Sequence, residues 1–285
     1  MQSISSNIKV IFSLVICFLL LQKVDAQLRI NEFLASNSAS VYDPDYGVFA
    51  DYVELYNASS SSISLANYSL TDKPDNKAKW IFPDINLEAG QYLVLWADGN
   101  NKYIGDTAFS EFKNRNIVVT ALHLSYRLSA DGEYLGLFDA KGKLVDEISF
   151  GVQENDVSYG RNPSNPNEWL FFNEVTAGNS NSNFGANSLD YASEPTFNLQ
   201  GGFYPSTQVL QISSTETEAE IRFTFDGSEP KKNSILFGTS FNVIRNYVVK
   251  ARAYVPGKLP SPVVTMTYFI GENISLPVIS ISSNS

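Results

Sequence analysis

Alternating apolar and polar positions recur along the chain in short runs, and each run ends in residues that favour turns. The stretch 51–57 shows the pattern clearly. Val53 and Leu55 point to one face and Glu54, between them, points to the other, because side chains in a strand alternate with a period of two. Small polar residues at 58–62 then end the run. We therefore predict a strand of a half-buried sheet, with one face apolar and the other, which carries Glu54, in water.

The same pattern predicts strands in both halves of the chain, separated by Gly, Asp and Asn turns at intervals of roughly ten residues. Sustained apolar spacing of three and four residues, which would indicate helices, does not occur. The fold class that we expect is all-β, with two consecutive immunoglobulin-like β-sandwich domains. The predicted strands are 28–34, 51–57, 91–97, 122–128, 134–138, 144–150, 208–213, 220–225, 248–255 and 263–270.

Residues 1–26 have the layout of a secretory signal peptide: Lys9 precedes an apolar run, and Ala26 provides a small residue for cleavage. A membrane anchor is the alternative, but the apolar run is short against the ~20 residues of a spanning helix. Cleavage after Ala26 would remove Cys17, the single cysteine, so we expect no thiol and no disulfide in the exported chain. We expect the protein to be secreted or to lie on the extracellular surface, without membrane insertion after cleavage.

The best domain boundary is the polar segment 178–193, which is rich in Gly, Asn and Ser. We expect it to be mobile and open to proteolysis. The predicted organisation is a signal peptide (1–26), a first β-sandwich (27–185), a linker (186–193), a second β-sandwich (194–271), and a segment (272–285) that either starts a further domain or is a free tail.

Charge narrows the range of partners. The chain has 20 basic and 30 acidic residues, a net charge of −10. Such a balance disfavours nucleic acid and anionic membrane surfaces as partners, because both are negatively charged. The sequence does not indicate an oligomeric state.

Catalytic residues are not apparent in the sequence. His123 is the single histidine, and we expect it on a polar strand face with a structural or surface role, since a Gly-x-Ser-x-Gly nucleophile motif is absent. Strand carboxylates such as Glu32, Glu54, Asp146 and Glu147 are expected to be solvated. One histidine and no cysteine after cleavage also argue against a zinc site. A stand-alone hydrolase remains the alternative.

Two sets of residues are candidates for binding. Asp43, Asp45 and Asp51 place three carboxylates within nine residues, a set that could collect around calcium, and a solvated acidic turn is the alternative. Apart from calcium, no cofactor is expected. Trp80 and Trp169 could stack on sugar rings, or they could pack in the core as we expect for Trp96.

Several ordered blocks in the first half resemble the lamin-tail domain of secreted bacterial proteins. Tyr52 departs from the bacterial pattern, which more often has Trp there. The resemblance extends from about Gln27 to Gly185 and implies an immunoglobulin-like sandwich that serves as a binding or adaptor module without catalytic residues. The blocks are INEFLASN (30–37), DYVELYN (51–57), LANYSLTD (65–72), KWIFP (79–83), AGQYLVLW (89–96), 122–128 and VSYGR (157–161).

The second half resembles the small sandwich at the C-terminus of chitobiase-type hexosaminidases, over about 194–271. The turn DGSEP (226–230), after the strand 220–225, carries most of this resemblance, together with 202–204 and 249–254. It implies an accessory module without an active site. The strand-like run 274–282 then follows. The whole order resembles the front of secreted proteins with a CotH-like kinase domain, which would place a catalytic part beyond Ser285. A free-standing protein of two modules is the alternative.

These observations together predict a noncatalytic, secreted or cell-surface binding or adaptor region built of two β-sandwich modules. Its expected partner is a cell-surface glycan or protein. The second hypothesis is the accessory N-terminal part of a larger CotH-like enzyme, and the third is a stand-alone hydrolase.

Overall fold

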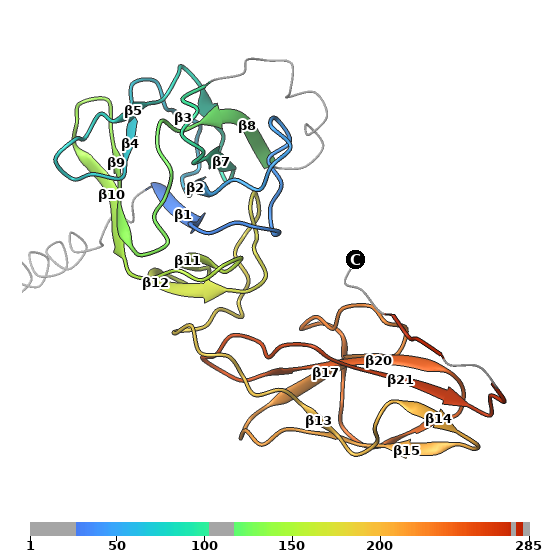
Figure 1. Cartoon of the computed structure of the whole chain (residues 1–285). Coiled ribbons are helices and arrows are strands. Elements are labelled where there is room, and N and C mark those ends of the chain that lie inside the picture. Colours follow the sequence, from blue (N-terminus) through green and yellow to red (C-terminus); the bar gives the residue numbers. More distant parts are fainter. Residues whose placement is uncertain (1–26, 103–116, 275–277, 282–285) are drawn as a thin grey trace, which may run out of the picture.

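The computed structural model describes residues 27–102, 117–274 and 278–281, and every regular element within them is a β-strand. The strands form two units, one drawn from blue to yellow-green and the other from orange to red (Figure 1). The all-β, immunoglobulin-like fold class is therefore confirmed. The predicted signal peptide lies outside the described residues. Within the described part of the chain, no helix has the length and apolar character needed to cross a bilayer.

The first unit is built on a six-stranded sheet in which neighbours are antiparallel, except for the parallel pair at one edge, β7 and β8. Its order is β12 (Asn165–Phe172), β11 (Ser158–Asn162), β1 (Leu28–Leu34), β2 (Tyr52–Asn57), β7 (Tyr92–Trp96) and β8 (Ile117–His123). Strand β8 ends earlier than the predicted strand 122–128, although the alternating apolar residues of that range are all buried, namely Leu122, Leu124, Tyr126 and Leu128.

A second, four-stranded sheet and a short strand pair complete this unit. Its order is β10 (Leu144–Phe150), β9 (Glu133–Phe138), β4 (Ser69–Thr71) and β5 (Trp80–Ile81), and β3 (Ile63–Ser64) pairs with β6 (Asn86–Leu87). The main apolar core contains residues of both sheets, among them Ile30, Phe33, Val53, Leu55, Leu70, Leu93, Leu95, Leu135 and Leu137.

Strand β2 is buried on both faces, which corrects the prediction of a wet face. Val53 and Leu55 belong to the main core as expected. On the opposite face Tyr52 and Trp96 join a second apolar cluster, which the segment after β12 covers with Val175 and Ala177. The local pattern does not reveal this cover because it comes from residues more than a hundred positions away. Strand β7 is also buried on both faces, since its residues are apolar on both alternating sets.

The second unit also consists of layered sheets. Its five-stranded sheet has the order β14 (Gly202–Tyr204), β21 (Val264–Ile270), β20 (Tyr247–Tyr254), β17 (Glu220–Thr224) and β18 (Ile235–Leu236). Two antiparallel pairs accompany it: β13 (Thr196–Phe197) with β16 (Ile212–Ser213), and β15 (Gln208–Leu210) with β19 (Phe241–Val243). Its core includes Leu210, Ile221, Phe223, Val243, Val249 and Tyr268.

The segment that joins the units is hydrogen-bonded to both of them, whereas we expected it to be mobile. Ala186 exchanges two backbone hydrogen bonds with Phe171 on β12, and Ala192 N–H donates to the carbonyl of Leu259 in the second unit. Val157, Ala186 and Leu259 form a small buried apolar cluster. The two units are therefore packed against each other through this segment, which fixes the surface between them.

Candidate functional site

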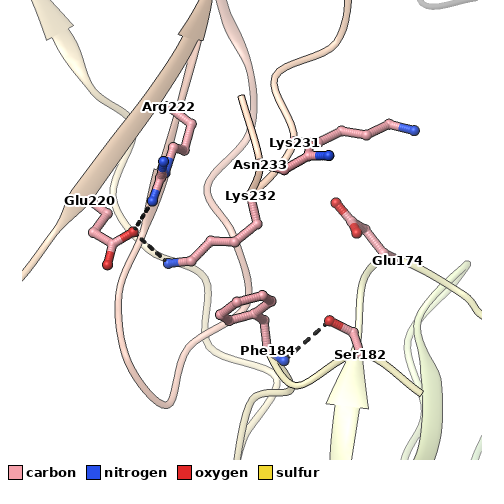
Figure 2. Close-up of a pocket in the computed structure, with 8 residues that line it drawn as sticks. All are labelled: Glu174, Ser182, Phe184, Glu220, Arg222, Lys231, Lys232 and Asn233. Atoms are coloured by element: carbon pink, nitrogen blue, oxygen red, sulfur yellow. Dashed lines mark hydrogen bonds and ion pairs between the residues drawn. The ribbon is translucent and has the colours of Figure 1, made fainter. Parts of the chain in front are cut away.

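A pocket of about 470 Å³ lies between the two units (Figure 2). One wall comes from the segment after β12, and the other comes from β17 and the turn that follows it. Its lining residues are Glu174, Ser182, Phe184, Glu220, Arg222, Lys231, Lys232 and Asn233. Because neither unit supplies all of these residues, the site depends on the packing of one unit against the other.

The strand period brings the charged groups of β17 to one face. Glu220 and Arg222 are two residues apart, so both side chains lie on the face away from the core residues Ile221 and Phe223. Arg222 Nη2 donates to Glu220 Oε2 over 2.7 Å, and Lys232 Nζ lies 2.9 Å from the same oxygen (Figure 2). The result is a carboxylate held between two cations at the pocket wall.

An exposed aromatic ring faces these charges. Phe184 has 57% of its surface exposed, and Lys232 Nζ lies 5.0 Å from the centre of its ring. The Phe184 N–H donates to Ser182 Oγ over 3.2 Å, which holds the backbone of this turn (Figure 2). Apolar ring surface, ammonium, guanidinium and carboxylate groups are therefore present within one pocket, a combination that suits recognition of a polar ligand with an apolar face.

The charge state of Glu220 does not suit acid catalysis. Hydrogen bonds from Lys232 and Arg222 lower the pKa of Glu220, so this carboxyl stays ionised at neutral pH. A glycosidase needs one carboxyl whose pKa is raised, so that it can donate a proton to the leaving group. Glu220 therefore does not match the general acid of a glycosidase.

Two of the carboxylates that we expected to be solvated are fully buried. Glu32 and Glu54 are both 0% exposed, and burial raises the pKa of each carboxyl. Glu32 accepts hydrogen bonds from the backbone and the side chain of Thr176, and Glu54 accepts one from the backbone N–H of Gly178. These carboxylates hold the covering segment on the sheet and have no access to a substrate.

Of the other strand carboxylates, Asp146 is tied into an ion pair and Glu147 is exposed. Asp146 accepts hydrogen bonds from Arg161 Nη2 at 2.7 Å and from the Ile30 N–H at 2.8 Å. Glu147 accepts a hydrogen bond from the Tyr134 hydroxyl over 2.9 Å. Their partners are structural, and they do not face each other as a catalytic pair.

His123 is buried at 0% exposure, which corrects the expectation of a polar strand face. Its Nδ1 lies 2.9 Å from Asp98 Oδ2, and its Nε2 lies 3.3 Å from Asp45 Oδ2. A Ser-His-Asp site requires a hydroxyl on the second ring nitrogen, and here a carboxylate stands in that place. The environment of His123 therefore does not match nucleophilic catalysis.

The predicted calcium ligands separate into two places. Asp43 and Asp45 lie in one loop, and their carboxylate oxygens lie within 4.8 Å of each other and of a ring nitrogen of His123. Asp51 is not part of this group, and its Oδ1 accepts the N–H of Asn37 over 3.0 Å. The set that the structure brings together therefore contains a histidine in place of the third aspartate.

Neither tryptophan that we considered for sugar stacking presents a free ring. Trp80 is 6% exposed, packs against Phe82, and donates its Nε1–H to the carbonyl of His123 over 3.1 Å. Trp169 stacks on Tyr159 at 5.4 Å, and the Arg161 guanidinium lies 4.7 Å from its ring centre.

Sequence reasoning missed the aromatic ring that does face the pocket. Phe184 stands in the polar segment 178–193, which we assigned to the domain boundary. An isolated phenylalanine among Asn, Ser and Gly was the available signal, because such a ring needs either an apolar partner or an exposed role. The charged residues of β17 could not be recognised as part of a site from the sequence, because the solvent-facing sides of strands are commonly charged.

Comparison with known proteins finds one family model in each half of the chain. The Lamin Tail Domain family model matches residues 22–151, and the model described as Fn3 associated matches residues 210–268. Both are noncatalytic, immunoglobulin-like types of domain. A stretch of 50 residues is 38% identical to an endoglucanase of Clostridium saccharobutylicum, and it covers 18% of this chain and 11% of that protein. The chitobiase-type resemblance and the CotH-like arrangement stay predictions. The chain thus contains a lamin tail domain followed by an Fn3-associated domain.

Proposed function

We propose that this chain is a noncatalytic binding or adaptor region of a secreted or cell-surface protein, and that its ligand is a surface glycan bound in the pocket between the two units. The observation that carries the proposal is the exposed ring of Phe184 beside the ion-paired Glu220, Arg222 and Lys232. A sugar has apolar ring faces that stack on an aromatic side chain, and hydroxyls that bond to charged groups.

Burial at this site supports a binding role. Phe184 and Lys231 are exposed, while Arg222 and Lys232 are partly buried and held by Glu220. Groups that are fixed before a ligand arrives lose little conformational entropy on binding. A fixed ion-pair network next to an exposed ring therefore gives a prepared surface.

The test is binding of the full chain to purified cell-surface glycans and surface proteins immobilised on an array. We expect glycan binding, and we expect Phe184→Ala to weaken it by about tenfold, which corresponds to about 1.4 kcal/mol. Lys232→Ala should act in the same direction. Phe203→Ala is the matched control, because Phe203 is 47% exposed in β14 and does not line this pocket.

Two results would count against the proposal. One is the absence of binding to any glycan or surface protein, and the other is equal loss in the Phe184 and Phe203 variants. Binding to a protein alone, with the same dependence on Phe184, would keep the adaptor role and replace the glycan with a protein partner.

A second candidate function is an accessory region of a larger secreted enzyme. The local match to an endoglucanase covers 11% of that protein, which fits a short accessory segment. The CotH-like kinase arrangement is one form of this candidate. Sequencing of the coding region past Ser285 decides between the forms: an open frame that encodes a kinase-like domain supports the CotH-like form, and an immediate stop codon rejects it.

A further inference from the structure

We propose that Asp43, Asp45 and His123 form a binding site for a divalent transition-metal ion such as Zn²⁺, with Asp98 as the residue that orients the imidazole. One oxygen of each aspartate and one ring nitrogen of His123 lie within 4.8 Å of one another. This set mixes one nitrogen ligand with two oxygen ligands, whereas calcium prefers oxygen alone. Zinc accepts carboxylate oxygens as well as Cys and His ligands, so a single histidine beside two aspartates is compatible with zinc.

Asp43 provides an independent sign of a cation site. Its side chain is 0% exposed, and its Oδ2 has no hydrogen-bond partner among the described residues. Its Oδ1 accepts the Asp45 N–H over 2.9 Å, so the two aspartates are held in one turn. A buried carboxylate oxygen without a partner is costly, and a metal ion would satisfy it.

The hydrogen bonding of His123 selects Nε2 as the metal ligand. A carboxylate only accepts, so the Nδ1 atom, 2.9 Å from Asp98 Oδ2, must carry a proton. In the neutral imidazole the unprotonated Nε2 then faces Asp45 Oδ2 at 3.3 Å. Two acceptors at this distance repel unless a proton or a cation lies between them. A carboxylate that holds the other nitrogen of a metal-bound histidine is a common arrangement in metal sites.

The separation between His123 Nε2 and Asp45 Oδ2 agrees with shared coordination. Two ligands that are each about 2.0–2.1 Å from a tetrahedral zinc ion lie about 3.3–3.4 Å apart. His123 Nε2 and Asp45 Oδ2 are 3.3 Å apart. The Tyr46 ring also packs edge-on against the imidazole, with ring centres 4.8 Å apart. The site is therefore shielded on one side, and three protein ligands leave a fourth position for water.

The test uses the full chain without a histidine tag, stripped of metal and titrated with ZnCl₂ in a calorimeter. We expect one Zn²⁺ per chain. Because His123 is the single histidine, its imidazole nitrogen signals in an NMR spectrum report directly on this site. Zinc should shift the Nε2 signal, whereas an imidazolium bonded to Asp45 would show two N–H groups and no response to zinc.

Variants locate the site. His123→Gln and Asp45→Asn should each weaken zinc binding by at least as much as Asp98→Asn, for which loss of the orienting carboxylate predicts about 10–100-fold. If His123→Gln does not fold, Asp45→Asn still tests the site. Asp45 is partly exposed, and its substitution leaves the contact of His123 with Asp98 intact. Asp75→Asn is the control, since Asp75 is exposed and outside the cluster.

Three results would overturn the inference. They are no zinc binding by the unaltered chain, zinc binding that the Asp45 and His123 variants leave unchanged, and equal weakening in Asp75→Asn. A titration with CaCl₂ separates this site from the calcium site that we considered first. Binding of calcium but not zinc, lost in Asp51→Asn, would favour the three aspartates instead.

Discussion

Glu32 on β1 and Glu54 on β2 stand opposite each other in the central sheet of the lamin tail domain, and both carboxyls are fully buried. Each accepts hydrogen bonds from the segment that follows β12. Glu32 also accepts the Tyr52 hydroxyl, and Glu54 accepts Asn31 Nδ2 over 2.8 Å. The pair therefore joins the start of the domain to the segment that leads to the second unit.

Because Glu32 and Glu54 are buried together, we predict that the free energy of unfolding falls as pH rises. Burial, followed by the charge of Glu32, raises the pKa of Glu54. The folded state then keeps a proton that the unfolded state has released, so its stability is highest below the ordinary carboxyl pKa and is lost as pH rises toward the raised value. Urea unfolding at pH 5 and pH 8 should show this loss, at most about 1.4 kcal/mol per pH unit for each proton.

Glu54→Gln tests which group is responsible. The neutral amide should remove much of the pH dependence and make the chain more stable than the unaltered protein at pH 8. Glu88→Gln is the control, because Glu88 is an exposed carboxylate in a turn and should leave the dependence as it was. An identical pH dependence in the Glu54 variant and the unaltered chain would contradict the assignment.

Thr176→Val should destabilise the domain by about 1–3 kcal/mol. The hydroxyl of Thr176 donates to Glu32 Oε2, and valine keeps the shape but leaves the buried carboxylate with one donor fewer. Urea unfolding measures the loss, and faster amide hydrogen exchange at Gly178 should report that the covering segment opens. Thr239→Val, at an exposed position, is the control and should be nearly neutral. A neutral effect of Thr176→Val would show that the carboxylates do not hold this segment.

Local pattern was enough to predict many of the strands, such as β1, β2, β7 and β10, but not β11 or β12. Val53 and Leu55 enter the core because a period of two places them there, and Trp96 is buried because its strand is apolar on both alternating sets. Signals of this kind depend only on neighbouring residues in the chain.

Features that depend on distant residues were not predictable in this way. Glu54 is buried by a segment that begins after β12, and His123 is buried by contacts with Asp45, Tyr46 and Asp98. The proposed metal ligands come from segments that are far apart in sequence, and so do the residues that line the pocket. Asp43 and Asp45 were recognised as candidate ligands from their spacing in the sequence. Their third partner is His123, whose position is set by the pairing of β7 with β8.

Arg161→Lys should cost about 2–3 kcal/mol. Arg161 on β11 forms a two-oxygen contact with Asp146 on β10, at 2.7 Å to each oxygen, so it ties the two sheets of the first unit together. Its Nε also donates to the Ile30 carbonyl over 2.7 Å. Lysine keeps the charge, but a single ammonium group cannot donate to Asp146 and to the Ile30 carbonyl at the same time, as the separate nitrogens of the guanidinium do.

The measurement for Arg161→Lys is urea unfolding, with Arg245→Lys as the matched control. Arg245 is exposed and contacts the Tyr247 ring, with no carboxylate partner among its described contacts. We expect the control to be nearly neutral. Equal stability of the two variants would show that charge alone, without the several hydrogen bonds of the guanidinium, holds the sheets together.

Leu259→Ala should loosen the contact between the two units. Leu259 is 1% exposed and packs with Val157 and Ala186, so truncation leaves a cavity and should cost about 2–4 kcal/mol. Because this cluster lies where the units meet, the loss should separate their unfolding into two calorimetric transitions and weaken ligand binding in the pocket of Phe184. Leu236→Ala is the matched control, since Leu236 is 50% exposed on β18. If both variants unfold and bind alike, the contact does not set the geometry of the pocket, and each unit would have to bind its ligand alone.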